Sequence, residues 1–440
     1  MRNWDVAVGS GGTGTCSTSP LNPPRKAAPQ AAPQALSLRL NFAWTTAGTI
    51  IYSACQWATV SLLAKLGSPE LVGQYALGIA VATPVLMLAQ LNLRAVVATD
   101  VRNENPFRDY LSLRLATSTL ALVLIALLVE VGGYRHEVAL ATLMVGFGLA
   151  IDGVSDICYG WQQQRERMER IAFSMIARGI LSAAAMGIGV YLTHSLIGGL
   201  VGSLLTRLVV LLALDLQLIP GNRDWRFFAS LRRQGRVLWL SLPLGVVLML
   251  NSLSMSAPRY WIEHHQGERM LGIFAAIASL MTIGGTLVNA LGQSATPRLA
   301  QLYSSRDRRG FHVLLAQLLG LVLLIGLAGI AIATVAGGPI LSLVYRPEYA
   351  GHNDLLIAMM AAGAIGYVGS LLGYAITATR TFRAQVPLFV AVAIATAGAC
   401  MWLIPAYGLM GGGMAIGLGA LVQVCGEILI LWRGSRRERA

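Results

Sequence analysis

Long apolar runs alternate with short polar segments along most of the chain, and each run is long enough to cross ~30 Å of hydrocarbon as a helix. The breaks between runs contain polar or helix-ending residues, whose backbone groups are easily satisfied at a membrane surface but not in hydrocarbon. We therefore predict twelve membrane-spanning helices, at residues 41–64, 70–93, 110–131, 137–161, 168–193, 195–219, 237–257, 270–297, 311–336, 353–379, 383–404 and 408–432.

Three details of the predicted helix pattern rest on only a few residues each: one break between spans, one short segment and one glycine pair. Only a Thr-His-Ser break at 193–195 separates the fifth and sixth spans. We interpret residues 339–345 as a short piece along the membrane interface. The Gly284-Gly285 pair is expected to loosen the eighth span, because glycine weakens a helix.

Composition excludes a water-soluble fold of this size. Of the 440 residues, 55% are hydrophobic and only 12% are charged, whereas soluble domains have about 25% charged residues. The net charge of +13 would suggest nucleic acid in a soluble protein, but here the basic residues lie in clusters between apolar runs. Lipid headgroups and an anionic substrate are therefore the expected partners, and nucleic acid is not.

The distribution of arginine predicts how the chain lies in the membrane, since cytoplasmic loops carry the excess of Lys and Arg. One alternate set of loops, together with both termini, is rich in Arg. The opposite set contains Lys65, Arg135, Arg259, Arg269 and Arg346. Both termini are thus expected to be cytoplasmic, which requires an even number of spans and agrees with twelve.

The predicted organisation is two six-helix lobes in an all-α polytopic membrane protein. Residues 1–40 are interpreted as a disordered cytoplasmic tail, since their Gly-rich run lacks the Lys of a phosphate loop. The lobes occupy residues 41–219 and 237–432. A basic cytoplasmic linker (220–236) and a basic tail (433–440) complete the chain.

Weak self-similarity relates the two lobes. Residues 73–76 (Gly-Gln-Tyr-Ala) begin the second span, and residues 272–275 (Gly-Ile-Phe-Ala) begin the eighth. A second match has identical spacing in the fourth and tenth spans: Ser155, Tyr159 and Arg165, against Ser370, Tyr374 and Arg380. Because six spans separate each match, the repeat is parallel. Coincidence among Gly-rich and Ala-rich helices is the alternative.

The sequence lacks the residue motifs of nucleotide hydrolysis, metal binding and disulfide frameworks. The chain has no nucleotide-binding Gly-x4-Gly-Lys motif and only two lysines, and its five cysteines are scattered. The Glu263-His264-His265 cluster is interpreted as a solvated turn and not as a metal site. We therefore expect no enzyme activity, cofactor or metal.

Ionisable residues at bilayer depth are the best functional candidates, because they are costly unless they face a cavity or each other. Asp152 and Asp156 share one face of the fourth span, and Arg178 on the fifth span lies at a similar depth to Asp152. A structural ion pair and an ion-coupling or substrate site explain this equally well.

Arg207 lies near the middle of the sixth span. We expect it to line a polar cavity unpaired, where its N–H donors could hold a phosphate or pyrophosphate; the alternative is pairing with an acid on the fourth span. Among other embedded residues, Asn251, Asn289, Gln293 and Glu427 are interpreted as contacts between helices.

Four segments carry a resemblance to a known family. Residues 259–264 (Arg-Tyr-Trp-Ile-Glu-His), 271–276 and 287–300 resemble parts of the seventh and eighth spans of oligosaccharide flippases, and residues 344–350 resemble the external loop after their ninth span. These are the Wzx-like polysaccharide transporters of the multidrug/oligosaccharidyl-lipid/polysaccharide exporter superfamily. Asn289, Gln293 and Arg298 lie in the matched segments.

The resemblance implies a V-shaped pair of lobes that moves an undecaprenyl-pyrophosphate-linked oligosaccharide across the bacterial cytoplasmic membrane. It implies as partners the lipid-linked oligosaccharide, membrane lipids, a polysaccharide polymerase and glycosyltransferases. Arg178, Arg207 and Arg259 are the candidate headgroup contacts, and Arg298 is expected at the cytoplasmic surface. The alternatives are a cation-coupled multidrug antiporter of the same superfamily and a membrane-embedded polymerase or acyltransferase.

Overall fold

Helices form wherever the apolar runs predicted them. The computed structural model describes residues 38–100, 106–217, 219, 231–305, 307–379 and 384–437. Its helices in chain order are α1 (Leu38–Leu66), α2 (Pro69–Gln90), α3 (Leu93–Thr99), α4 (Phe107–Val131), α5 (His136–Gln164), α6 (Met168–Thr193), α7 (Leu196–Val210), the π-helix η1 (Leu211–Asp215), α8 (Leu231–Ser304), α9 (Arg308–Val344), the 3-10 helix η2 (Pro347–His352), α10 (Asn353–Ala378), α11 (Gln385–Tyr407) and α12 (Leu409–Arg437).

A helix lies at each of the twelve expected spans. Within the described residues, ten helices are long and apolar enough to cross a membrane. One of them, α8, contains two expected spans, while α1 is not among the ten. The break at His194 is confirmed: this residue has a left-handed conformation between α6 and α7. The chain is thus a multi-pass membrane protein.

The structure corrects the expected turn between the seventh and eighth spans. α8 continues through residues 258–266 and leaves helical geometry only at Gly267, whose φ of 81° glycine adopts without steric cost. Gly267 divides α8 into a first arm (231–266) and a second arm (268–304). Arg259, expected in an external loop, instead lies within the first arm, about 12 Å before the bend at 1.5 Å per residue.

Three further expectations differ from the structure. Residues 339–344 continue α9 and do not form an interfacial piece, because Pro339 is accommodated within the helix. The Gly284-Gly285 pair does not break α8; Gly284 instead leaves room for the ring of Tyr367 on α10. The second span is followed by the short helix α3, since Leu91 and Asn92 adopt left-handed conformations after α2.

The expected tails and linker are only partly described. Residues 1–37 and 220–230 lie outside the described residues. α8 begins at Leu231, inside the expected linker, and α12 extends to Arg437, inside the expected C-terminal tail.

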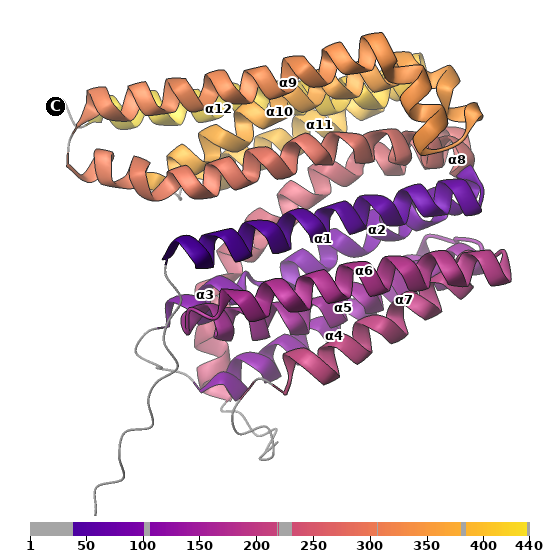
Figure 1. Cartoon of the computed structure of the whole chain (residues 1–440), viewed down its shortest axis with the longest axis horizontal. Helices are drawn as coiled ribbons and strands as arrows, with labels where there is room; N and C mark the ends of the chain where they lie inside the picture. Colours follow the sequence, from indigo (N-terminus) through magenta and orange to yellow (C-terminus); the bar gives the residue numbers. More distant parts are fainter. Residues whose placement is uncertain are drawn as a thin grey trace, which may run out of the picture. The chain divides into compact units, whose positions relative to one another are not determined.

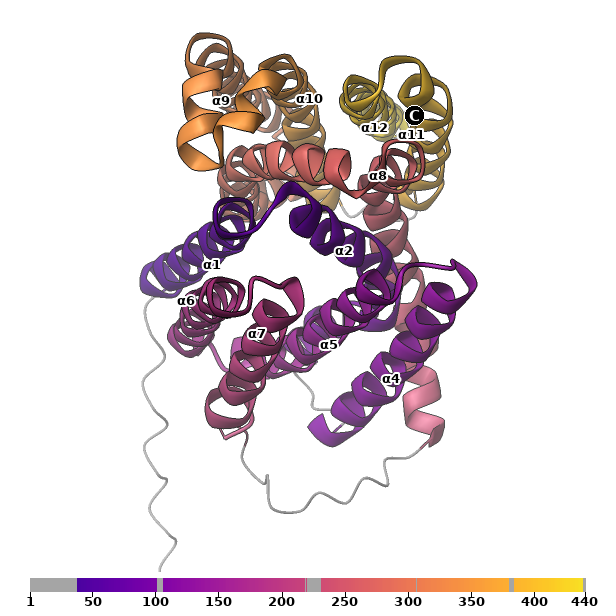
Figure 2. The same ribbon diagram turned by 90° about the vertical axis from the view of Figure 1, so that its right-hand side faces the viewer.

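The two halves of the described chain meet through α8. Helices α1–α7 pack among themselves, α9–α12 pack among themselves, and α8 contacts both groups, most extensively α2 (Figures 1 and 2). The repeated segments 73–76 and 272–275 each lie four residues after the start of α2 and of the second arm of α8. Corresponding elements of the repeat therefore lie against each other where the halves join.

Candidate functional site

Asp152 on α5 is the centre of a buried ion-pair chain in the N-terminal half. Its Oδ1 lies 3.3 Å from Nη1 of Arg178 on α6, and its Oδ2 pairs with Nη1 of Arg207 on α7. Arg178 also pairs through Nη2 with Asp215. The chain therefore runs Arg207, Asp152, Arg178, Asp215, with Asp152 shared between the two arginines.

The π-helix η1 at the end of α7 contributes Asp215, which is 2% exposed. The carboxylate of Asp215 also accepts a hydrogen bond from the hydroxyl of Ser174, which in turn lies 2.9 Å from the hydroxyl of Tyr159. Asp215 is thus held by two groups of α6. Arg178 would keep this acidic partner even if Asp152 moved away.

A second cluster lies on the same face of α5, toward the C-terminal end of that helix. Asp156 is 3.2 Å from Nη1 of Arg94 on α3 and 3.7 Å from Nη2 of Arg114 on α4. The ring of Tyr159 stands between the clusters, with the guanidinium carbons of Arg94 and Arg178 each 5.6 Å from its centre. Cations over an aromatic face are attracted by the ring quadrupole. Tyr159, identified from the repeat, therefore links the two clusters.

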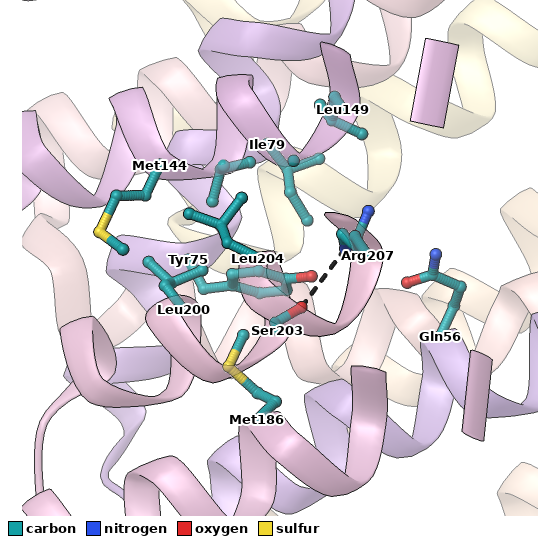
Figure 3. Close-up of a pocket in the computed structure, with 12 residues that line it drawn as sticks. Gln56, Tyr75, Ile79, Met144, Leu149, Met186, Leu200, Ser203, Leu204 and Arg207 are labelled. Carbon is teal, nitrogen blue, oxygen red and sulfur yellow. Dashed lines mark hydrogen bonds between the residues drawn. The ribbon is translucent and has the colours of Figure 1, made fainter. Parts of the chain in front are cut away.

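A cavity of about 190 Å³ opens beside Arg207. Figure 3 shows the polar side chains of Arg207, Gln56, Tyr75 and Ser203 at the cavity, with Met144 and Leu200 at the side away from Arg207. The Nε of Arg207 donates to Oγ of Ser203 at 3.3 Å. The residues that line the cavity come from α1, α2, α5, α6 and α7, so the cavity lies inside the N-terminal half. The volume is below the roughly 300–1,000 Å³ of drug-sized sites and suits a small charged group.

The pairing of Arg207 differs from expectation. Arg207 does line a cavity, as predicted, but it is paired with Asp152; the alternative of an acid on the fourth span is the one observed. The predicted pair of Asp152 with Arg178 is confirmed. Asp215 pairs with Arg178 and not with Arg207 on its own segment.

The remaining candidate arginines are separate from this cluster. Arg259 is partly buried on α8 and makes no ion pair with any described residue. Arg298 is exposed near the end of the second arm of α8. Arg380 lies outside the described residues. Tyr374, which belongs to the same repeated motif as Arg380, packs its ring against Gly292 of α8.

The amides of the second arm of α8 do not join helices, contrary to expectation. Asn289 and Gln293 are exposed, one turn apart on one helix face. Neither forms a hydrogen bond with a described residue, and Asn251 on the first arm is likewise exposed. An unpaired amide costs free energy in hydrocarbon, so this face of α8 suits contact with water or a polar ligand.

Sequence reasoning missed Arg114, which is fully buried, and the role of Asp215. Arg114 lies inside the predicted third span, where an arginine one turn from the helix start was the available signal. The position of Asp215 depends on the π-helix, which no residue pattern indicated. Within the described chain, no three His, Cys, Asp or Glu side chains are grouped as a metal site would require.

The fold is shared with solved structures of membrane transporters. The fold matches an inward-facing multidrug resistance MATE family transporter of the MOP superfamily with a TM-score of 0.65 and 17% identity, over 92% of this chain and 96% of that one. It also matches a MOP superfamily transporter from Pyrococcus furiosus, described as having a binding pocket of reverse polarity. There the TM-score is 0.63 and the identity 16%, over 90% and 95% of the two chains.

The family follows from the sequence comparison. The model of the polysaccharide biosynthesis protein family matches residues 38–303, and the chain belongs to this family. It is 24% identical over 387 residues to the capsular polysaccharide biosynthesis protein CapF of Staphylococcus aureus, covering 87% of this chain and 96% of CapF. The resemblance to Wzx-like members of the superfamily is confirmed.

Proposed function

We propose that this protein moves a lipid-linked oligosaccharide with an anionic diphosphate headgroup across the bacterial cytoplasmic membrane, with both termini in the cytoplasm. It does so without covalent chemistry of its own. A diphosphate with attached sugars cannot cross hydrocarbon unaided, because burial of a charge without partners is prohibitive. The observation that carries the proposal is the cavity beside Arg207.

The charge balance of the N-terminal half favours an anion. Its two clusters contain four arginines and three aspartates, namely Arg94, Arg114, Arg178, Arg207, Asp152, Asp156 and Asp215. Each aspartate already pairs with at least one arginine. The surplus is a positive charge, and only Arg207 among these arginines borders the cavity of about 190 Å³. A cavity built for a cationic drug would be expected to present an unpaired carboxylate instead.

The geometry leaves Asp152 with a cation, Arg178, when Arg207 changes partner. Asp152 is shared by two arginines, and Arg178 keeps Asp215 when Asp152 is withdrawn. A phosphate oxygen in the cavity could therefore replace Asp152 on Arg207, because guanidinium binds carboxylate and phosphate with the same fork of N–H donors. Asp152 thus acts as an internal substitute for the substrate anion.

The second arm of α8 offers a route for the sugar portion. Asn289 and Gln293 present unpaired amides, which match sugar hydroxyls as both donors and acceptors. Arg259 on the first arm, without an acidic partner in the described chain, is a further headgroup contact. These residues lie on the helix that joins the halves, where alternating access would expose them first to one side and then to the other.

Binding of inorganic pyrophosphate to the purified chain tests the cavity. The wild type should bind it, and Arg207→Gln should bind at least about tenfold more weakly, since a charged hydrogen bond contributes roughly 1.5–3 kcal/mol. Arg298→Gln, which changes an exposed arginine away from the cavity, is the matched control and should bind like the wild type. Equal binding by wild type and Arg207→Gln would remove this site from the proposal.

A cation-coupled drug antiporter predicts the opposite ranking of variants. Its indispensable group would be an embedded carboxylate, so Asp152→Asn should abolish transport while Arg207→Ala is tolerated. The flippase proposal expects Arg207→Ala to lose transport. Formation of a covalent product by the purified protein would instead establish a polymerase or acyltransferase.

A further inference from the structure

The C-terminal half contains a carboxyl group that the proposed anion site does not use. Glu427 lies on α12 and is 1% exposed. Its Oε1 accepts one hydrogen bond, from Nε2 of Gln423 one turn earlier, at 3.1 Å. Its Oε2 is buried and has no hydrogen-bond partner in the described structure.

The facing helix covers this group with glycines. A Cβ added to Gly373 of α10 would lie 3.4 Å from Oε1 of Glu427, and one added to Gly369 would lie 3.2 Å from the Gln423 amide. On the cytoplasmic side, Leu431 packs in an apolar cluster with Leu299 and Ala375. The carboxyl is therefore enclosed. Because Gly369 and Gly373 have no side chains, the α10 backbone itself faces the carboxyl and the Gln423 amide.

Among the described residues of the surrounding helices, no charged side chain pairs with Glu427. α12 packs against α8, α10 and α11. On α10, the Tyr374 ring packs against Gly292 and the hydroxyl of Tyr367 donates to the Met281 carbonyl. Arg298 of α8 and Arg433 of α12 are both exposed.

The other titratable groups nearby are uncharged or apart from the carboxyl. In its described range, α11 carries only Cys400 and Tyr407 as titratable groups, and Cys425 on α12 is exposed. Glu427 forms no ion pair with any described residue.

An ionised carboxylate in such surroundings would carry a prohibitive desolvation cost, so the group must hold a cation. A metal ion needs several oxygen ligands. Because the Gln423 amide N–H donates to Oε1, Glu427 offers only Oε2 without a hydrogen-bond partner. A proton needs only that oxygen. We propose that Glu427 is a proton-binding site of the C-terminal half, occupied in the conformation seen here.

Binding and release are simple proton exchange. The carboxylate takes a proton from water to become a neutral acid, and returns it when water reaches the group. Because the facing cover is glycine backbone, a small separation of α10 from α12 would admit water. A carboxyl that loads and unloads in this way would couple proton movement to changes in the C-terminal half, independently of what Arg207 binds.

Infrared difference spectroscopy on the full chain in lipid vesicles tests this site directly. A protonated carboxyl has a carbonyl band that shifts in D₂O and disappears on ionisation. At neutral pH the wild type should show this band, Glu427→Gln should lose it, and alkaline titration should remove it reversibly from the wild type. Glu130→Gln, at an exposed glutamate in the last turn of α4, is the matched control and should keep the band.

A second variant protects the test from a folding failure of Glu427→Gln. Gln423→Leu keeps the carboxyl but removes the donor to Oε1, so it should retain the band and change the pH at which the band disappears. The proposal is overturned if the wild type lacks the band at neutral pH, or if Glu427→Gln leaves it unchanged. It is also overturned if the band persists at every pH at which the protein stays folded, since Glu427 would then be a permanently neutral structural acid.

Discussion

Gly73 of α2 and Gly272 of α8 lie back to back where the two halves of the chain meet. A Cβ on Gly272 would overlap the carbonyl of Pro69 and would lie 2.9 Å from the backbone nitrogen of Gly73. A Cβ on Gly73 would overlap the carbonyl of Glu268. The two residues begin the repeated segments, so equivalent positions of the repeat form the contact between its copies.

Gly272→Ala should loosen this contact. The added methyl group forces α2 and α8 apart, and overpacking of this kind costs about 1–3 kcal/mol. Thermal unfolding of the purified protein should show a lower midpoint. Gly320→Ala is the matched control, because a Cβ there meets nothing within 4 Å and alanine favours the helix. A midpoint for Gly272→Ala equal to that of Gly320→Ala would contradict the close approach.

The same end of the structure carries polar contacts between the halves. Glu268 accepts a hydrogen bond from Gln74 of α2 at 2.9 Å and lies 3.8 Å from Arg135 at the start of α5. Arg269 lies 3.8 Å from Glu70 of α2. These groups lie beside the Gly267 bend. This group of contacts lies at the end of the helices opposite the predicted cytoplasmic termini, and Arg233 near the start of α8 forms a further contact, 2.9 Å from Asp109 of α4.

Asp152→Asn should increase affinity for pyrophosphate. Removing the charge that occupies Arg207 leaves this guanidinium free for the ligand, while Arg178 retains Asp215. The gain should be about tenfold if one charged hydrogen bond is exchanged. Titration calorimetry with Asp156→Asn as control, whose partners are Arg94 and Arg114, separates a local effect from a general change in charge. Weaker binding by Asp152→Asn would show that the carboxylate supports the anion site and does not compete with it.

Arg114 and Arg178 should respond oppositely to replacement by methionine. Arg114 has no hydrogen-bond partner for its three guanidinium nitrogens in the described structure, and its acid Asp156 retains Arg94. Replacement of a poorly paired buried charge is often neutral or stabilising. Arg178→Met, in contrast, leaves buried Asp215 without a cation and should cost roughly 3–5 kcal/mol.

Unfolding midpoints of the two variants in the same lipid or detergent provide the comparison. Arg114→Met should unfold near the wild-type temperature or above it, and Arg178→Met well below. Equal losses in both variants would show that Arg114 has a stabilising role that its contacts do not reveal.

The polar face of α8 should be accessible to water-soluble reagents. In a background without reactive cysteines, Asn289→Cys and Gln293→Cys should react with a charged thiol reagent that cannot cross the membrane, since their side chains are exposed on a polar face. Leu324→Cys is the control: Leu324 is 62% exposed on the apolar helix α9, where lipid should exclude the reagent. If the α8 positions react no faster than Leu324→Cys, that face is covered by lipid.

Much of the architecture was predictable because the lipid bilayer imposes a strong length constraint. Twelve apolar runs located every long helix, and the repeat identified Gly73 and Gly272 before their contact was visible. The bend of α8 was misplaced, because residues 258–266 are polar enough to resemble a loop while remaining helical. Only the left-handed geometry of Gly267 ends the first arm, and glycine at other positions, such as Gly284, instead makes room for a neighbouring ring.

The site was predictable only in part. Depth counting paired Asp152 with Arg178, since both are fixed by helix rise from one turn. It could not reveal that Asp152 also reaches Arg207, because that depends on how α7 rotates against α5. Nor could depth counting predict the partner of Asp215, because the π-helix sets the direction of its side chain.

The most direct test of the central claim is flipping of a polyprenyl-diphosphate-linked oligosaccharide by the purified protein in sealed vesicles, read out by a glycosidase added outside. Wild-type vesicles should lose labelled substrate beyond the fraction already in the outer leaflet, while Arg207→Gln vesicles should match protein-free vesicles and Arg298→Gln vesicles should match the wild type. Protection of the inner-leaflet substrate in wild-type vesicles, or full flipping by Arg207→Gln, would contradict the account.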